Sequence, residues 1–334
     1  MIMERDFKNQ GWYQKEGLLS DNSNKNLLSY ISQSMFSGKH TTTYKYCFLK
    51  SILDNLYSAD ENYSLDFNII GETFVSIYWN MIVVYKIPQM SNYITGARSI
   101  FEKITEKMIS EKPYLAGIHY ESILEKDRKE FLKKAIPEFS KNVIGAFHED
   151  TEGMIYGFSK KDNKLWFNDY SFNFLSNNKA IIEQVNYYQW LKMVDTILKN
   201  NNQSINNLST ILENITQRND LSKYKRILEE YGETKTCFYC GKTIIKNMHL
   251  DHVIPWSFLK NDNLWNFVCS CPTCNSSKNN ILPKDIYLDK LVLRNKKYSI
   301  DSPNIKSVAN AAKLNGVRDG WEPKKQWKRK NMTN

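Results

Sequence analysis

The chain has 334 residues, a formal net charge of +10, and a composition that is 41% hydrophobic and 13% aromatic. Such a composition is sufficient for one large domain or two ordinary domains with apolar cores. The longest uncharged apolar stretch, residues 73–85, is shorter than the about 20 residues of a membrane span, so we expect no span. Residues 1–9 contain no apolar run, so we expect no signal peptide. We therefore expect a cytoplasmic location.

The N-terminal two-thirds of the chain has the pattern of a mostly helical region. Residues 1–40 are polar, with loop signals at 21–26 and 37–38, and we expect them to be ordered in part at most. From residue 41 onward, apolar side chains recur at the spacing of one helix face. Pro88 ends the second of these runs. Helices are predicted at residues 41–56, 65–85, 97–110, 121–136 and 178–199.

Residues 142–170 break this helical pattern. The short runs NVIGAFHED, MIYGF and KLWFND are rich in aromatic and β-branched residues, and turn signals lie between them at 152–153 and 161–163. The pattern predicts a small antiparallel meander within the helical region. Its simplest role is a local structural brace, and the alternative is a surface that senses DNA or a ligand.

The charge is unevenly distributed along the chain. Residues 236–334 carry 17 Lys and Arg against 7 Asp and Glu, whereas residues 1–235 carry 29 of each kind. The whole excess therefore lies in the C-terminal third, which favours a polyanionic partner for that region. The polar stretch 200–218 is expected to contain a domain boundary, and residues 221–231 are expected to form a helix that Gly232 ends.

Two cysteine pairs are the strongest signal in the C-terminal third. Cys237/Cys240 and Cys271/Cys274 are both C-x-x-C pairs, and each such turn supplies two ligands of a tetrahedral zinc site. We therefore predict one structural Zn²⁺ bound by these four thiolates. Cys269 precedes Cys271 by two residues, so we expect it to be a buried bystander, with a role as zinc ligand as the alternative.

Residues whose chemistry suits phosphodiester hydrolysis lie between and beside the cysteine pairs. Asp251 and His252 stand near the end of a predicted strand, 246–253, and Asn275 directly follows the last cysteine. An imidazole with a pKa near neutrality can deprotonate water. Oxygen donors from Asp251 and Asn275 suit Mg²⁺ or Mn²⁺ better than zinc. The amide of Asn266 can hold the loop that carries His252.

This set of residues resembles the HNH, or ββα-metal, endonucleases. The family pattern is a strand ending in Asp-His, a loop with a central Asn, and a helix that supplies His or Asn after the second cysteine pair. The resemblance implies that His252 is the general base, that Asp251 and Asn275 bind the catalytic Mg²⁺ or Mn²⁺, and that Asn266 holds the loop. The third signature residue is Asn instead of His, an HNN-type variant similar to bacterial restriction- and defence-like nucleases.

The predicted fold class is α+β. The expected organisation is a polar segment at 1–40, a mostly helical targeting or regulatory domain with the meander at 41–218, a zinc-stapled ββα-metal domain at 219–300, and a basic tail at 301–334. The domain at 41–218 could also bind a partner or regulatory protein, and no further family resemblance is evident in the first 230 residues.

Weaker candidates for nucleic-acid contact surround the predicted site. Lys278 lies one helical turn beyond Asn275 and could contact a phosphate or be solvated. His249 lies two residues before Asp251, on the same strand face, and could be an additional ligand, a phosphate contact or an exposed strand residue. The tail could grip the phosphate backbone or be a solubilising end. Its basic residues are Lys324, Lys325, Lys328, Arg329 and Lys330.

These features predict a metal-dependent endonuclease that cleaves DNA in restriction or phage defence. One alternative is an HNH effector that cleaves RNA. A second alternative, from a different functional class, is a zinc-stabilised DNA-binding module without catalytic activity.

Overall fold

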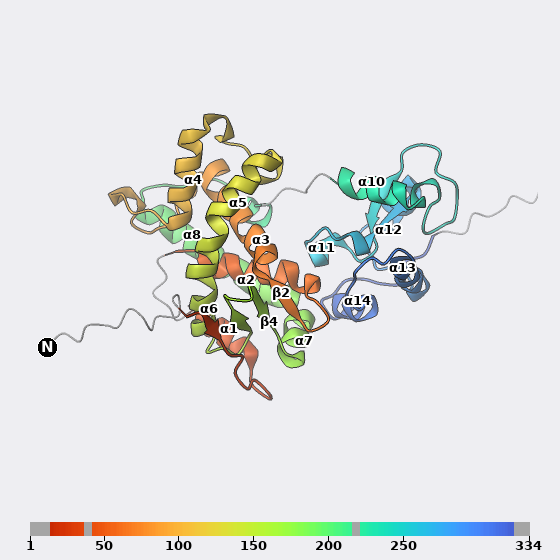
Figure 1. The fold of residues 1–334 in the computed structure, drawn as a ribbon, viewed down its shortest axis with the longest axis horizontal. Coiled ribbons are helices and arrows are strands. Elements are labelled where there is room, and N and C mark those ends of the chain that lie inside the picture. The colour runs from red at the N-terminus through yellow and green to blue at the C-terminus, as the bar shows by residue number, and fades with distance from the viewer. Residues whose placement is uncertain (1–13, 37–41, 216–220, 324–334) are drawn as a thin grey trace, which may run out of the picture. The chain divides into compact units, whose positions relative to one another are not determined.

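The computed structural model describes residues 14–36, 42–215 and 221–323. The chain divides into two compact units (Figure 1). Residues 1–219 form the N-terminal unit and residues 220–334 form the C-terminal unit.

The N-terminal unit is built mainly from helices and contains one small sheet. Its α-helices are α1 (Leu27–Phe36), α2 (Tyr44–Asn55), α3 (Phe67–Trp79), α4 (Ile100–Glu111), α5 (Glu125–Phe139), α6 (Gly145–Asp150), α7 (Asp169–Asn177), α8 (Lys179–Asn200) and α9 (Leu208–Glu213). Short 3₁₀ helices are η3 (Leu56–Ser58), η5 (Tyr93–Thr95), η6 (Pro113–Leu115) and η7 (Tyr120–Ser122), and π-helical turns are η4 (Asn80–Val84) and η8 (Ser140–Ile144).

Local capping explains where several of these helices begin. The side chain of Asp66 accepts a hydrogen bond from the backbone N–H of Asn68 at the start of α3. Ser99 and Glu102 form a reciprocal capping box at the start of α4. Such caps satisfy N–H groups that have no partner within the first helical turn.

Helix α3 and the π-helical turn that follows it form one long apolar segment, Phe67–Val84. Phe67–Val84 is long and apolar enough, by length and composition, to cross a membrane, but 67% of it is buried inside the protein. Burial of this kind is what a core helix of a globular unit shows.

Aromatic side chains from distant segments meet in the core of the N-terminal unit. The ring of Phe48 packs edge-on against Phe139 at 5.6 Å, Phe147 at 5.5 Å and Tyr156 at 5.9 Å between centroids. Phe74 reaches the same cluster through Phe139 at 5.1 Å. Edge-to-face contacts of this kind add to the stabilisation from burial.

The sheet of the N-terminal unit has four short antiparallel strands in the order β1-β3-β4-β2. The strands are β1 (Glu16–Gly17), β2 (Ser64–Asp66), β3 (Gly157–Ser159) and β4 (Lys164–Trp166). β3 and β4 form a hairpin in which Asn163 adopts a left-handed φ of 55°, as turn residues of this type tolerate. Within the segment at 1–40, expected to be ordered in part at most, the described residues 14–36 supply β1 and α1 to this unit.

The prediction of a strand at residues 142–150 is wrong. Residues 140–150 are helical, as η8 followed by α6, and only MIYGF and KLWFND supply strands. The buried side chains of Phe139, Val143 and Phe147 recur every four residues, which is a helical spacing. Packing of Phe147 against Phe48 and Tyr156 therefore outweighs the β-propensity of the run.

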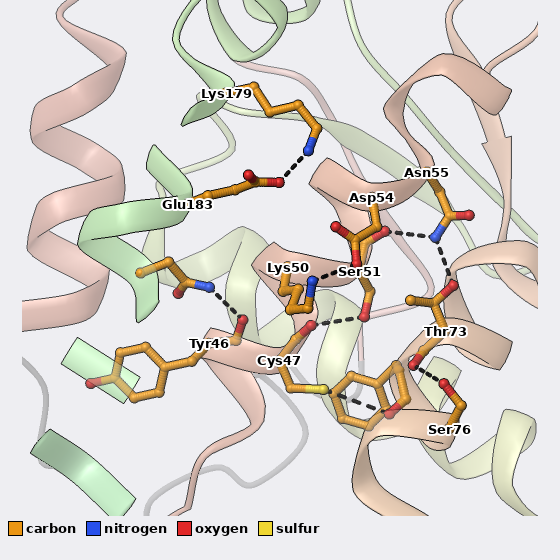
Figure 2. Close-up of polar contacts among 12 residues, drawn as sticks. Tyr46, Cys47, Lys50, Ser51, Asp54, Asn55, Thr73, Ser76, Lys179 and Glu183 are labelled. Atoms are coloured by element: carbon orange, nitrogen blue, oxygen red, sulfur yellow. Dashed lines mark hydrogen bonds and ion pairs between the residues drawn. The ribbon is translucent and has the colours of Figure 1, made fainter. Parts of the chain in front are cut away.

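A polar network crosses the contact between α2, α3 and α8 (Figure 2). Lys50 Nζ donates to Asp54 Oδ2 at 2.7 Å, and the fully buried Lys179 pairs with Glu183. The amide of Asn55 donates to the carbonyl of Ser51 and to the hydroxyl of Thr73. Pairing charges one helical turn apart limits the cost of removing them from water, so this network is explained as a brace of the helical core.

The C-terminal unit contains a two-stranded sheet with helices around it. Its elements are α10 (Ser222–Glu230), η9 (Glu233–Lys235), β5 (His249–His252), α11 (Trp256–Leu259), η10 (Leu264–Asn266), β6 (Phe267–Ser270), α12 (Pro272–Lys278), α13 (Asp285–Lys297) and α14 (Ile305–Leu314). Helix α10 ends before Gly232, which has a left-handed φ of 71°. In the region expected to be a tail, residues 301–323 supply α14, and Trp321 makes a β-bridge with Pro283.

Apolar and polar contacts hold this sheet in place. Leu228 of α10 is buried against Phe267 and Cys269 of β6. On α13, the buried guanidinium of Arg294 donates to the carbonyl of Phe267 at 2.7 Å, and Asn295 donates to the carbonyl of Trp265 at 2.9 Å. These bonds satisfy backbone carbonyls where β6 begins.

Candidate active site

The four cysteines of the C-x-x-C pairs come together. Their Sγ atoms all lie within 4.8 Å of one another, and those of Cys240 and Cys271 are 3.9 Å apart. Zn–S bonds of about 2.3 Å at tetrahedral angles place neighbouring sulfurs about 3.8 Å apart. The cluster therefore has the ligand type, ligand number and spacing that a zinc ion needs, and it could bind zinc as the sequence predicts.

Backbone geometry explains how the first cysteine pair forms its turn. Gly241 adopts φ = 69°, a region that favours glycine, and its N–H donates to the carbonyl of Cys237 at 3.0 Å. The N–H of Cys237 donates to the carbonyl of Lys242 at 2.8 Å, and the N–H of Phe238 donates to the carbonyl of Cys269 at 2.9 Å. The last of these bonds ties the first cysteine turn to β6.

Cys269 itself lies apart from the four-cysteine group. Its side chain is 2% exposed and packs against Leu228 and Phe267. Burial, with a smaller contribution from the charge of Glu233, raises the pKa of its thiol to about 11. Cys269 is thus a buried, neutral thiol in the apolar cluster.

Strands β5 and β6 and helix α12 form the frame of the candidate site. The strands are antiparallel, with Asp251 opposite Val268 and His252 opposite Phe267. Side chains alternate between the faces of a strand, so His249 and Asp251 share one face of β5. Asn275 and Lys278 are three residues apart and share one face of α12. These two faces meet through Lys278 with Asp251 and through Asn275 with His249.

Asp251 is held by two buried partners. Tyr239, which stands within the first C-x-x-C turn, donates its hydroxyl to Oδ2 of Asp251 at 2.5 Å. Lys278 Nζ lies 3.2 Å from the same oxygen, 3.5 Å from Oδ1, and 2.6 Å from the carbonyl oxygen of His252. The Lys278 side chain is fully buried and that of Asp251 is 10% exposed. Burial lowers the pKa of Lys278, and the charge of Asp251 opposes this shift.

This geometry corrects the prediction for Lys278. A solvated lysine or a phosphate contact at the surface would require an exposed ammonium group. The residue instead spans from α12 to β5, where its ammonium binds a carboxylate and a main-chain carbonyl. The position of Lys278, one turn after Asn275, predicts which face of α12 it lies on. It does not predict that β5 covers this face.

His249 and Asn275 form the second contact between these faces. Asn275 Nδ2 lies 3.1 Å from Nδ1 of His249, and both side chains are half-buried. Because the amide nitrogen can only donate, Nδ1 accepts the hydrogen bond and the amide oxygen of Asn275 takes no part in this contact. His249 is thus neither a fully exposed strand residue nor remote from Asp251.

Asn266 bridges the loop that follows β5. Its side chain is fully buried, its Nδ2 donates to the carbonyl of Ile254 at 2.8 Å, and its Oδ1 accepts from the N–H of Ile254 at 2.8 Å. Its own carbonyl accepts from the N–H of Val253 at 3.0 Å. These three bonds fix the backbone immediately after His252.

His252 faces the opposite side of β5 from Asp251. Its Nε2 lies 2.9 Å from Oδ1 of Asp262, and its ring packs against Phe267 with 4.3 Å between centroids. The side chains of His252 and Asp262 are 12% and 8% exposed. Asp262 is not recognisable as a site residue from the sequence, because an aspartate in a polar loop ten residues from the histidine has no periodic relation to it.

The donor set of the site fits a hard divalent cation in kind. Asp251 supplies a carboxylate and Asn275 an amide oxygen, which are the ligand types that Mg²⁺ and Mn²⁺ prefer. Asp251 already accepts bonds from Tyr239 and Lys278, but an ionised carboxylate has about four lone-pair sites and can take further ligands. Asp251, with Asn275, would therefore hold the ion alongside these partners.

The basic residues of the predicted tail, Lys324, Lys325, Lys328, Arg329 and Lys330, lie outside the described residues.

Comparison with known proteins agrees with this geometry. Residues 237–284 match the family model of HNH endonucleases. The match spans both cysteine pairs and the Asp251, His252, Asn266 and Asn275 positions, so the C-terminal unit carries an HNH endonuclease domain. No curated protein and no solved structure matches the chain.

Proposed function

We propose that the protein is a metal-dependent HNH endonuclease that hydrolyses phosphodiester bonds in DNA. The observation that carries the proposal is the coincidence of the family match at 237–284 with a well-braced frame of β5, β6 and α12. There, the cysteine cluster, the Asp251–Lys278 pair and the Asn266 bridge fix the strand that bears His252. The family implies nuclease activity on nucleic acid, and the choice of DNA over RNA as the substrate is part of our proposal.

Each site residue has a distinct role in this proposal. His252 takes the proton of the attacking water, since a histidine base is suited to neutral pH. Asp251 and Asn275 bind the cation, and Asn266 keeps His252 at its position. When bound, Mg²⁺ or Mn²⁺ would neutralise charge on the scissile phosphate and on the leaving oxygen. Zinc in the cysteine cluster would stabilise the fold.

The charge of the C-terminal unit supports a polyanionic substrate. Exposed basic side chains occur on α10, around the first cysteine pair and on α13: Lys223, Lys225, Arg226, Lys242, Lys246, Lys290, Lys296 and Lys297. Basic groups of this kind bind phosphates through salt-sensitive contacts. Exposed lysines that are paired with acids contribute less. Such pairs are Lys225 with Glu229, Lys297 with Glu233 and Lys306 with Asp289.

The N-terminal unit is assigned to targeting or control. Residues 1–219 carry 25 Lys and Arg and 25 Asp and Glu, and the unit has a large apolar core of its own, so it has little basis for binding a phosphate backbone by charge alone. A protein or ligand partner suits it better. Restriction or phage defence in the cytoplasm is the biological setting that we propose.

The test compares the full-length protein with His252→Ala on plasmid DNA, phage DNA and tRNA, in Mg²⁺, in Mn²⁺ and without a divalent ion. We expect metal-dependent cleavage of DNA by the wild type, and a loss of at least about 100-fold in the variant with zinc content and DNA binding unchanged. Cleavage confined to tRNA would indicate an RNA-cleaving effector. Binding without cleavage under every condition would indicate a zinc-stabilised binding module.

A further inference from the structure

The contact between His252 and Asp262 determines which nitrogen of the imidazole is available. An ionised carboxylate only accepts hydrogen bonds, so across the 2.9 Å contact Nε2 of a neutral His252 carries the proton. Nδ1 is then the unprotonated nitrogen and the one that can take a proton from water. The low exposure of both side chains, 12% and 8%, and the packing of the ring on Phe267 restrict other arrangements.

Asp262 is in turn held by helix α10. The hydroxyl of Tyr224 donates to the main-chain carbonyl of Asp262 at 2.5 Å. The ring of Tyr224 packs on Phe267 with 4.6 Å between centroids, so Phe267 contacts both Tyr224 and His252. Burial, followed by the charge of Asp262, raises the pKa of Tyr224 to about 12, so the hydroxyl remains a donor at neutral pH.

We infer that Asp262 and Tyr224 are positioning residues for the catalytic base, with Asp262 fixing the tautomer and orientation of His252 and Tyr224 fixing the loop that carries Asp262. This inference rests on the proposed role of His252. It extends the active site to α10, which begins only two residues after the boundary between the two units. The inference also explains why the carboxylate of Asp262 is buried, since a loop with a purely structural role would not require a buried charge there.

The contact has a chemical consequence that a structural hydrogen bond lacks. An asparagine at position 262 can keep a hydrogen bond to Nε2, but its side chain can donate through the NH₂ group as well as accept through the amide oxygen. Donation to Nε2 would place the proton on Nδ1, the nitrogen that must be free. In the serine protease triad, the equivalent Asp→Asn change leaves the geometry intact and lowers the rate by about 10⁴ because the tautomer is wrong.

The experiment uses the full-length protein with Asp262→Asn, Asp262→Ala and Tyr224→Phe. Asp289→Asn, an exposed aspartate on α13, and Tyr298→Phe, whose hydroxyl donates to the carbonyl of Tyr231, are matched controls. Single-turnover cleavage is measured with saturating protein on the nucleic acid that the wild type cuts, together with binding affinity and zinc content. We expect rate losses of at least about 10-fold in both Asp262 variants and about 2- to 5-fold in Tyr224→Phe, with binding and zinc unchanged.

A measurement without cleavage separates this inference from the proposed function. In ¹⁵N NMR of histidine-labelled protein, the wild type should show a protected Nε2–H signal for His252, which His252→Ala assigns. Asp262→Ala should lose that signal, and the Asp289 control should keep it. The inference is overturned if Asp262→Asn and Asp262→Ala cleave at the wild-type rate while His252→Ala is inactive, or if the signal survives in Asp262→Ala. If His252→Ala cleaves normally, the role of the base fails instead.

Discussion

The ammonium group of Lys278 lies 3.2 Å from Oδ2 of Asp251 and 2.6 Å from the carbonyl of His252, with its side chain fully buried. The ammonium group of one lysine thus connects α12 to two neighbouring residues of β5, both of which belong to the proposed active site. Removing one partner of a buried ion pair costs more stability than the intact pair contributes, because the remaining charge is left unpaired in a low-dielectric site.

Replacement of Lys278 by methionine should therefore destabilise the C-terminal unit. The loss is expected to be about 3–5 kcal/mol, because methionine fills much of the same volume but leaves the Asp251 carboxylate buried and unpaired. Urea unfolding without added divalent ions measures the effect. The control is Lys284→Met, whose partner Glu322 is 56% exposed, and a surface pair of that kind is worth about 0–1 kcal/mol. Equal unfolding midpoints for the two variants would contradict the prediction.

The cysteine cluster should bind one zinc ion that the C-terminal unit requires for folding. Cys237→Ser is expected to lower the zinc content and unfold residues 221–323, because binding free energies of structural zinc are on the order of 10 kcal/mol and the surrounding core is small. Cys269→Ala is the matched control, since this thiol is buried but lies outside the cluster. Zinc loss in the control, or normal zinc in Cys237→Ser, would reject the assignment.

The sequence predicts the cysteine cluster, because the spacing of two C-x-x-C turns carries the chemistry of a zinc site. The contact between His249 and Asn275 is not evident from the sequence, although strand periodicity places His249 on the same face as Asp251. Burial is different, because it depends on which face another element covers. Lys278 is one turn beyond Asn275, as expected, yet the covering strand makes its ammonium an internal partner. Asp262 could not be found because its contact depends on the path of a loop.

The same distinction applies to the fold. The helices around Phe48 and Phe74 follow from apolar periodicity, whereas residues 142–150 have strand-forming side chains but are helical. Their conformation is set by packing against aromatic rings more than 90 residues away in the sequence, such as Phe48. Local propensity carries no information about such a contact.

The stability of the N-terminal unit should fall as pH decreases below about 6.5. His148 is 9% exposed, and its Nε2 lies 2.9 Å from the carbonyl of Leu18. Burial lowers the pKa of His148 from its ordinary value of 6.5. The unfolded chain then binds a proton that the folded chain resists, so the contribution is fully present above pH 6.5 and is lost as pH falls toward the folded pKa. The slope is at most about 1.4 kcal/mol per pH unit.

Urea unfolding of the wild type and His148→Gln at about pH 7.5, 6.5 and 5.5 tests this linkage. The wild type should lose stability across this range, and His148→Gln should lose less, because glutamine does not titrate. Parallel curves for the wild type and His148→Gln would contradict the prediction.

The basic residues at the C-terminal end should contribute to non-specific DNA binding. Removal of residues 324–334 deletes five positive charges. Each phosphate contact that is lost should reduce the slope of log K against log salt by about 0.9. Fluorescence anisotropy at several salt concentrations measures the slope, and substitution of the five basic residues by glutamine controls for chain length. An unchanged slope would assign these residues to a solvated end.

The two-unit organisation predicts that the N-terminal unit restricts the nuclease. The C-terminal unit has its own buried cluster around Leu228 and Phe267 and contains every residue of the proposed site. The ββα-metal segment, which the family match places at residues 237–284, has little surface left for reading a sequence once it holds a phosphate and a metal. We therefore expect a fragment that begins at residue 221 to cleave the same DNA set with lower selectivity than the full-length chain.

A fragment with Asp289→Asn controls for surface changes, and one with His252→Ala controls for contaminating nucleases. If fragment and full-length protein share sites and rates, the N-terminal unit has no targeting role and its function lies in binding a separate partner.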